Sequence, residues 1–354
     1  MFVDPVTRRP DQPGANISTS GPNGAALVIG LVNIMPPAAM RTIENLFRLL
    51  LNACASPGNI HLRLFSLNKN GAVESCGAPQ DYETLHDLWD SPDSEHPLDA
   101  LIVTGTESRA RSMEDEACWP DLQRICDWAG ENTISTLWSC FSAHAAVLHL
   151  DNIHRQPFPE KLSGIFECEK ASNHPIFKNM PTHFPAPHSR YNNLSEAELE
   201  AARYEILSRS PLTGPDSFIK QHKSSQFLFL QGHLEYGAEM LFAEYCRDLK
   251  RFALGQSVIY PKPPQNYFDQ TALAAFEAAT PDMLSSADFI NTVTANLSSD
   301  WQAPARRLYT AWLAFIGEQK VNAARDSTLV NGPFAAGAFN SLRSSETPAH
   351  ITQP

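Results

Sequence analysis

Apolar residues occur in short continuous runs in the first 150 residues of the chain. The runs at 25–35, 98–105 and 134–139 are rich in β-branched or bulky residues and are typical of strands buried on both faces. Residues 60–67 alternate between apolar and polar side chains, which predicts a further strand. Pro36 and Pro37 end the first run.

Segments with helical spacing separate these runs. Apolar stripes at a period of three to four residues predict helices over 42–53, 119–132 and 141–150. A short helix is also expected within the polar residues 80–95. Strands that alternate with helices of 10–15 residues favour an α/β fold with a doubly wound, mostly parallel sheet.

The second half of the chain is predicted to add shorter strands and then helices. Strands are expected at 204–208, 217–220 and 226–231, followed by a helix over 237–252. Residues 257–266 form a proline-rich linker. Beyond the linker, helices are predicted over the ranges 271–279, 286–297 and 305–319.

The composition changes along the chain predict its organisation. An N-terminal arm, an α/β domain, a linker with a helical extension and a disordered tail are expected over 1–24, 25–255, 256–324 and 325–354. Hydrophobic residues make up 43% of the 354 residues, which is enough for a sizeable core.

Charge and cysteine content narrow the class of protein. With 27 Lys+Arg and 39 Asp+Glu the formal net charge is −12, which argues against general binding to nucleic acid or an anionic membrane. The seven cysteines form no C-x-x-C pair, which argues against a zinc site or a disulfide framework. The polar start of the chain has no secretory pattern, and we expect a cytoplasmic protein without a bound metal.

Cys140 is the first candidate for chemistry. It lies between a predicted strand and a predicted helix, at the carboxyl edge of the sheet where open α/β folds place their sites. A helix N-terminus favours the thiolate, which is the nucleophilic form of cysteine. On position alone, however, a small buried hydrophobic role is the more common one for a free cysteine.

His233 and Glu235 form the second candidate, directly after the predicted strand 226–231. Residues two apart in extended backbone point the same way, so the carboxylate can orient the imidazole. Alone, this pair is better explained as a surface His-Glu contact. Together with Cys140 it resembles the site of class I glutamine amidotransferases, which implies that type of α/β fold.

Further segments carry a more specific resemblance. They are Asn33-Ile-Met-Pro36, Phe47-Arg-Leu-Leu50, Val103-Thr-Gly105, Ser135-Thr-Leu-Trp-Ser-Cys140, Glu160-Lys-Leu-Ser-Gly164, Ala186-Pro-His-Ser-Arg-Tyr191, Gly232-His-Leu-Glu-Tyr236 and Arg247-Asp248. In order and spacing across about residues 26–255, the chain resembles the homoserine O-succinyltransferase (homoserine O-acyltransferase) family of methionine biosynthesis. Neither 160–164 nor 186–191 has a regular period, so we assign no element to them.

The resemblance implies a ping-pong acyl transfer with acyl-CoA as co-substrate and no tightly bound cofactor. Cys140 would form the acyl-enzyme, and His233, oriented by Glu235, would deprotonate the hydroxyl of homoserine or a related amino acid. Backbone N–H groups near Cys140 and after Gly105 would stabilise the oxyanion. By resemblance we also expect a homodimer.

The resemblance also implies a set of substrate-binding residues. One of Arg190 and Arg247 is expected to bind the acceptor carboxylate through its bidentate fork. Lys161 matches the family's pocket lysine and is expected on the acyl or CoA side, and Ser189 lies in the same family segment as Arg190. Outside this context each cation would be interpreted as an ordinary surface residue.

The chain departs from the family around the expected pocket. The segments Met35–Arg41 and Thr104–Glu107 differ from the usual pattern, and Arg109 aligns with the family position associated with acyl choice, where glycine or glutamate is common. We predict that Arg109 pairs with the distal carboxylate of a succinyl group. The alternative is that its long side chain fills the pocket and leaves room only for acetyl.

Other functions remain open from the residues alone. A glutaminase or amide hydrolase would use the same Cys140, His233 and Glu235, although Trp138 and Ser142 replace the glycines common around a glutaminase nucleophile. A serine O-acyltransferase paralogue would differ only in its acceptor. A degenerate paralogue with a binding or regulatory role is supported only by the altered segments.

Overall fold

The computed structural model describes residues 27–55, 59–67, 81–89, 97–279 and 283–330. The predicted arm (1–24) and residues 331–354 of the predicted tail lie outside these ranges. The described strands are β1 (Leu27–Asn33), β2 (Ile60–Ser66), β3 (Glu83–Thr84), β4 (Ala100–Val103), β5 (Ser135–Ser139), β6 (Gln156–Lys170), β7 (His183–Asn193), β8 (Glu205–Ser210), β9 (Gly214–His222) and β10 (Ser225–Leu230).

The helices alternate with the strands in the first half and gather at the C-terminal end. They are α1 (Pro37–Cys54), α3 (Leu85–Trp89), α4 (Trp119–Asn132), α5 (Phe141–Asp151), α6 (Glu196–Ala201), α7 (Met240–Ala253), α8 (Gln270–Ala278), α9 (Ala287–Thr294) and α10 (Gln302–Val330), with a 3-10 turn at Met283–Ser285. None of the helices in the described ranges combines the length and apolar character needed to cross a bilayer.

All ten described strands belong to one sheet in the order β3-β2-β1-β4-β5-β10-β9-β8-β6-β7. The strands from β3 to β10 in this order pair in parallel, and those from β10 to β7 pair antiparallel. Strand β10 therefore joins the two halves, and its parallel neighbour β5 carries Cys140 at its carboxyl end. The site lies near the middle of the sheet.

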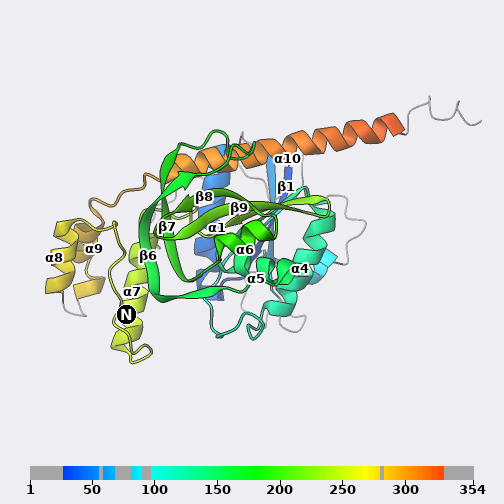
Figure 1. Ribbon diagram of the computed structural model, residues 1–354. Coiled ribbons are helices and arrows are strands. Elements are labelled where there is room, and N and C mark those ends of the chain that lie inside the picture. The colour runs from blue at the N-terminus through cyan, green and yellow to red at the C-terminus, as the bar shows by residue number, and fades with distance from the viewer. Residues whose placement is uncertain (1–26, 56–58, 68–80, 90–96, 280–282, 331–354) are drawn as a thin grey trace, which may run out of the picture.

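Helices cover both faces of the sheet (Figure 1). Alternate residues of β1 face opposite sides because strand side chains alternate. Ile29 packs in the cluster that contains residues of α1 and α10, whereas Val28 packs in the cluster that contains residues of α4 and α5. The doubly wound α/β fold predicted from the sequence is thereby confirmed.

Strands β6 and β7, the two longest in the sheet, were not predicted. Prolines at 157, 159, 185 and 187 interrupt them, and proline cannot donate to a strand ladder. The register of the pair also shifts between Pro157 and Leu162. The two strands tolerate these prolines because β7 is the last strand of the sheet, and β6 pairs with β8 only at Glu169 and Lys170, so the proline-bearing part of each strand has a single neighbour in the ladder.

The predicted linker adds a short stretch of backbone to β6. Gln265 forms a parallel bridge with Gly164, accepting from Ile165 N–H at 2.9 Å and donating to Ser163 C=O at 2.8 Å. Gly164 has a φ of +146°, and a Cβ there would lie 2.3 Å from the Gln265 carbonyl oxygen. The final glycine of the 160–164 segment is therefore required by close backbone approach.

The helical extension packs on the main sheet through buried aromatic residues. Trp312 of α10 donates from its indole nitrogen to Ser135 Oγ at 2.9 Å, and Trp301 donates to the Tyr236 carbonyl at 2.8 Å. Helix α10 continues to Val330, past the 305–319 expected from the sequence, and extends beyond the body of the protein (Figure 1). The extension thus supports the segment that carries His233 and Glu235.

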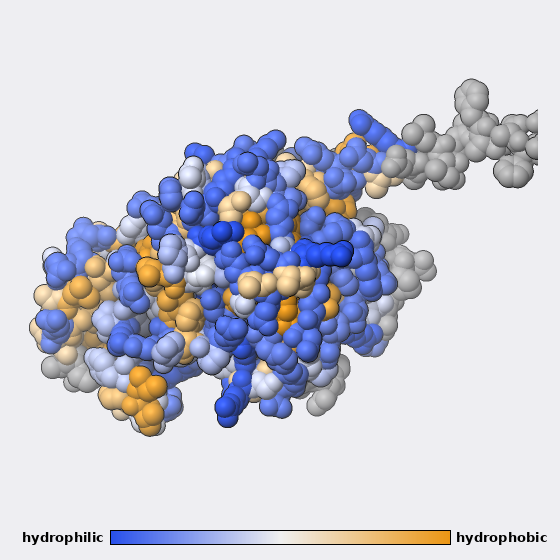
Figure 2. All heavy atoms as spheres, in the orientation of Figure 1, coloured by the Kyte–Doolittle hydropathy of each residue, from blue (hydrophilic) through white to orange (hydrophobic). Residues whose placement is uncertain are grey.

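The surface in Figure 2 is mostly hydrophilic, and apolar residues gather where α7, α8 and α9 lie. Three strongly exposed apolar side chains, Leu254, Val258 and Ile259, directly follow α7.

We predict that Gly164→Ala lowers the free energy of unfolding by more than about 2 kcal/mol, because the new Cβ collides with the Gln265 backbone at an unfavourable φ. Gly317→Ala is the matched control, since nothing lies within 4 Å of its Cβ position and it lies inside α10. The control should be neutral or more stable by up to about 1 kcal/mol. Urea unfolding monitored by circular dichroism measures both, and equal stability of the two variants would contradict this account.

Candidate functional site

Cys140 lies at a strained turn between β5 and α5. Its φ of 49° and ψ of −106° are outside the regions that non-glycine residues favour. Its N–H donates to the Leu230 carbonyl of β10 at 2.7 Å, which holds the turn against the neighbouring strand. The side chain therefore projects at the carboxyl end of β5 and the N-terminus of α5, as in the nucleophile elbows of α/β-hydrolases.

His233 follows β10 by three residues. Its N–H donates to the Pro187 carbonyl of β7 at 2.8 Å, and its ring stacks on Tyr236 with centroids 4.3 Å apart. Nδ1 lies 2.8 Å from Glu235 Oε1. Burial by itself would lower the pKa of His233, but Glu235 and Cys140 together raise it well above its ordinary value. The predicted trio is therefore assembled, with His233 between the carboxylate and the thiol.

A cavity of about 570 Å³ opens over these three residues. Four of the five substrate-binding candidates also line it, namely Lys161, Ser189, Arg190 and Arg247. The cavity walls come from α1, the loop after β4, α5, β6, β7, the segment after β10 and α7, with one residue each from α9 and the 3-10 turn before it. Elements from both halves of the sheet and from the extension thus share one site.

Lys161 and Ser189 meet at Glu244, a residue that the sequence analysis did not single out. Lys161 Nζ lies 2.7 Å from Asp248 Oδ2 and 3.7 Å from Glu244 Oε2, and Ser189 Oγ donates to the same Glu244 oxygen. Tyr236 OH donates to the other Glu244 oxygen at 2.8 Å. Burial would raise the pKa of Glu244, but the neighbouring cations Lys161 and Arg247 and the Ser189 bond lower it, so Glu244 is ionised.

Arg247 belongs to a charged stripe on α7. Its Nε donates to Asp248 Oδ1 at 3.1 Å, and the Arg251 Nη2 donates to Glu107 Oε2 at 2.8 Å across the cavity wall. Glu244, Arg247, Asp248 and Arg251 recur at helical spacing. That periodicity was the signal in the sequence by which Glu244 could have been found.

Arg190 is buried beneath the site, with 3% of its surface exposed. It donates from Nη2 to the Thr213 carbonyl and from Nη1 to the Asn192 carbonyl, both at 2.6 Å, and from Nη1 to Asn193 Oδ1 at 2.9 Å. Burial lowers the pKa of Arg190 to about 10, against the opposing effect of Cys140 and Asp216. Most donors of Arg190 already have acceptors within the protein. Arg247 therefore has more capacity than Arg190 to bind a ligand.

Arg109 is the one candidate that the structure does not bring into the cavity. Its side chain is exposed and does not line the wall, although its backbone N–H donates to Glu116 Oε1 at 2.9 Å. A different arginine, Arg155, lines the cavity. No motif or periodicity in the sequence distinguished Arg155 from a surface cation.

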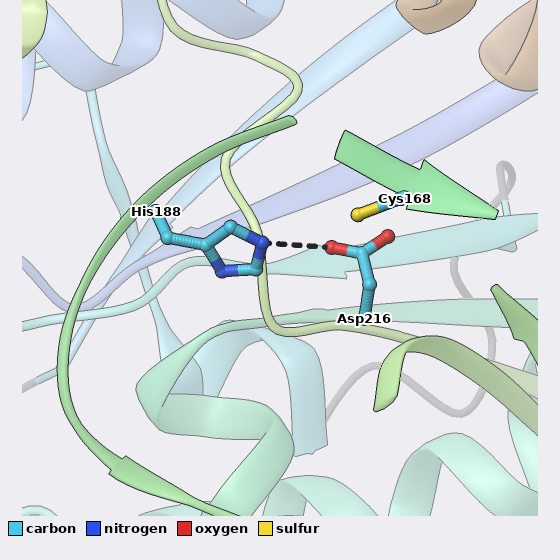
Figure 3. Close-up of side chains that lie close together, drawn as sticks. All are labelled: Cys168, His188 and Asp216. Carbon is cyan, nitrogen blue, oxygen red and sulfur yellow. Dashed lines mark ion pairs between the residues drawn. The ribbon is translucent and has the colours of Figure 1, made fainter. Parts of the chain in front are cut away.

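A buried cluster lies behind the site on β6, β7 and β9 (Figure 3). Donor atoms of Cys168, His188 and Asp216 lie within 4.8 Å of one another, so these residues could in principle ligate a metal ion. However, Arg190 Nε donates to His188 Nδ1 at 3.3 Å, which leaves the proton on Nε2, 3.3 Å from Asp216 Oδ1. Nδ1 is thus engaged, and Nε2 contacts Asp216 without forming a hydrogen bond within the described residues. Burial raises the pKa of the Cys168 thiol, which disfavours the thiolate that would bind a metal.

This cluster fixes the backbone next to His233. A Cβ on Gly232 would lie 2.6 Å from Asp216 Oδ1 and 3.2 Å from the His188 ring. Asp216 also accepts from Ser208 Oγ at 2.8 Å and stays ionised, since His188 and Arg190 lower its pKa despite its burial. The cluster therefore acts as a charged, hydrogen-bonded support beneath the turn that carries His233.

The sheet, the cavity and the Cys-His-Glu cluster define an α/β protein with a site at the carboxyl ends of its central strands. Residues 18–323 match the family model for homoserine O-succinyltransferase. A homoserine O-succinyltransferase of Methylorubrum extorquens is 40% identical over 307 residues, covering 84% of this chain and 89% of that one. A homoserine O-succinyltransferase of Rhodopseudomonas palustris is 41% identical over 280 residues, covering 78% and 80%.

The chain belongs to the homoserine O-succinyltransferase family, a family of O-acyltransferases. Among solved structures, a glutamine amidotransferase of Thermotoga maritima is 11% identical with a TM-score of 0.49, covering 82% of this chain and 98% of that one. The family model and the two relatives confirm the family resemblance inferred from the motifs. The homodimer and the cytoplasmic location stay predictions.

We predict that His144, on the cavity wall, makes the protein acid-sensitive. Its Nε2–H donates to Gln231 Oε1 at 2.8 Å, and burial lowers its pKa to about 3. In the unfolded chain it titrates near about 6.5, so the unfolded state binds the extra proton between these values. Stability is therefore lost as the pH falls through this window, by at most about 1.4 kcal/mol per pH unit.

His144→Gln keeps a donor for Gln231 but removes this titration. Urea unfolding at pH 7.5 and 5.0 should show a smaller loss of stability on acidification in the variant than in the wild type. Parallel pH dependence in the two proteins would contradict the assignment of a buried neutral imidazole.

Proposed function

We propose that this protein transfers an acyl group from acyl-CoA to the hydroxyl of homoserine through an acyl-Cys140 intermediate. The carrying observation is the strained Cys140 turn beside the His233–Glu235 pair in a cavity lined with charges of both signs. Acyl transfer to homoserine follows from the family, and the names of the relatives support succinyl as the acyl group.

In the first half-reaction the Cys140 thiolate attacks the thioester carbonyl of acyl-CoA. The C–S bond to CoA breaks, and the CoA thiolate takes the proton from the His233 imidazolium. The raised pKa of His233, caused by Glu235 and Cys140, supports an imidazolium in the resting enzyme.

Backbone amides stabilise the tetrahedral intermediate. The N–H of Phe141, at the start of α5, donates to no other residue within the described ranges, and it lies 3.5 Å from the position of a Cβ on Gly105. The Phe141 amide and the amides that follow Gly105 thus supply an oxyanion hole next to Cys140.

In the second half-reaction His233 accepts the proton from the homoserine hydroxyl. The alkoxide oxygen attacks the acyl-Cys140 carbonyl, and the Cys140 thiolate leaves. Glu235 holds Nδ1 of His233 and stabilises the imidazolium that forms, so Nε2 is the nitrogen that moves the proton.

The α7 wall complements a zwitterionic acceptor. Arg247, with 38% of its side chain exposed, supplies a cation for the α-carboxylate, and the ionised Glu244 supplies an anion for the α-ammonium. Lys161 and Ser189 position Glu244. Homoserine presents an α-carboxylate and an α-ammonium to this wall, and so does glutamine. The wall alone does not distinguish the two, but the family match favours the transferase over a glutaminase.

We predict that Cys140→Ala abolishes release of CoA thiol from succinyl-CoA and homoserine, with a loss of about 10⁴-fold or more. Glu235→Gln should lower kcat by about 10²- to 10⁴-fold, since it removes the charge that stabilises the His233 imidazolium. Thiol release is followed with a chromogenic disulfide reagent, using acetyl-CoA and serine as the competing donor and acceptor.

Cys54→Ser is the matched control, because Cys54 contacts Arg306 of α10 outside the cavity. It should keep wild-type turnover. Ammonia release from glutamine that depends on Cys140, with no thiol release from any acyl-CoA, would contradict the transferase and support the amide hydrolase.

A further inference from the structure

Arg155 is a cavity cation that neither the trio nor the acceptor wall uses. It lies in the turn between α5 and β6, just after Asn152, which ends α5 in the left-handed conformation with a φ of 55°. Only 9% of its side chain is exposed, and it lines the same cavity as Cys140 and His233.

The polar contacts of the Arg155 guanidinium all involve one nitrogen, Nη2. Nη2 donates to the Ala110 carbonyl at 3.1 Å and to the Arg111 carbonyl at 3.4 Å. It also lies 3.8 Å from Glu116 Oε1. That oxygen already accepts from Ser108 Oγ at 2.6 Å and from the N–H of Ala110 at 3.0 Å, so it is a weak partner for Arg155.

The other edge of the guanidinium is open. Within the described ranges, Nε and Nη1 of Arg155 donate no hydrogen bond. By contrast, the cations on and beside α7 have close carboxylate partners: Lys161 of β6 and Arg247 of α7 pair with Asp248, and Arg251 of α7 pairs with Glu107. Arg155 therefore keeps donors free for an anionic ligand in the cavity.

Arg155 also lies near Cys140 in space, because it contacts the residue and the loop that flank the nucleophile. Its Cζ lies 5.9 Å from the ring centroid of Phe141, the residue after Cys140. The loop that it contacts begins at Gly105, whose Cβ position is 3.3 Å from the Cys140 Cβ. An acyl group on Cys140 that extends along this loop would meet Arg155 and Ser108.

We propose that Arg155 is the carboxylate-binding residue for a dicarboxylic acyl group such as succinyl, attached to Cys140. This inference rests on the proposed acyl transfer and names the subsite that selects the donor. It moves the role expected of Arg109 to a residue inside the cavity, because Arg109 is exposed and Arg155 is not.

The test compares succinyl-CoA with butyryl-CoA, which has the same four-carbon acyl chain without the distal carboxylate. In Arg155→Met, kcat/KM for succinyl-CoA should fall about 10- to 100-fold while butyryl-CoA is used as well as or better than before. Arg155→Lys should recover part of the succinyl preference because it keeps the charge. Arg111→Met, an exposed arginine of the same loop, is the matched control and should change neither value.

The inference is overturned if Arg155→Met keeps the wild-type succinyl preference, or if Arg109→Met loses it instead. Equal loss of both donors in Arg155→Met and in Arg155→Lys would assign Arg155 a structural role and overturn it as well. Failure of the proposed function is distinguishable, because the wild type would then release thiol from neither donor.

Discussion

The hydrogen bond from Cys140 N–H to the Leu230 carbonyl, at 2.7 Å, is the contact on which the site depends. It joins the end of β5 to the end of β10, and so joins the turn of the thiol to the segment of His233 and Glu235. Without this parallel pairing the strained φ of Cys140 would relax, because a non-glycine residue persists in that region only when its surroundings hold it. The ends of two neighbouring strands thereby become one site.

The rest of the architecture supports that junction from behind. In the antiparallel half, the Pro187 carbonyl accepts a hydrogen bond from the His233 N–H, and His188 and Asp216 lie against Gly232. The C-terminal extension contributes Trp301, which donates to the Tyr236 carbonyl at 2.8 Å. These contacts explain why the site needs strands and helices from most of the chain.

Charge is distributed unevenly in the cavity. The α7 wall holds closely paired acids and bases, which suits a zwitterion because binding exchanges existing partners for new ones of the same sign. The wall near Arg155 holds a cation with unfilled donors, which suits a single carboxylate. The α7 wall thus matches the two opposite charges of an amino-acid acceptor, and the Arg155 wall matches the single distal carboxylate of a dicarboxylic acyl group.

Sequence patterns predicted the parallel core well, because buried strands and amphipathic helices there have regular periods. Strands β6 and β7 were missed because their prolines and glycine break the alternation, and only pairing at the sheet edge makes them strands. The trio was predictable because each member follows a recognisable strand. Arg109 lies outside the cavity and Arg155 lies inside it. Sequence patterns could not predict either position, because both residues lie in loops whose packing follows no regular period.

The central claim is that Cys140 carries the acyl group. The most direct measurement is peptide mapping by mass spectrometry after the wild-type enzyme is mixed with succinyl-CoA and acid-quenched without homoserine. The account predicts a succinyl adduct on Cys140 alone among the seven cysteines, and its loss when homoserine is added before the quench. Turnover without an adduct on Cys140, or an adduct that homoserine does not remove, would contradict it.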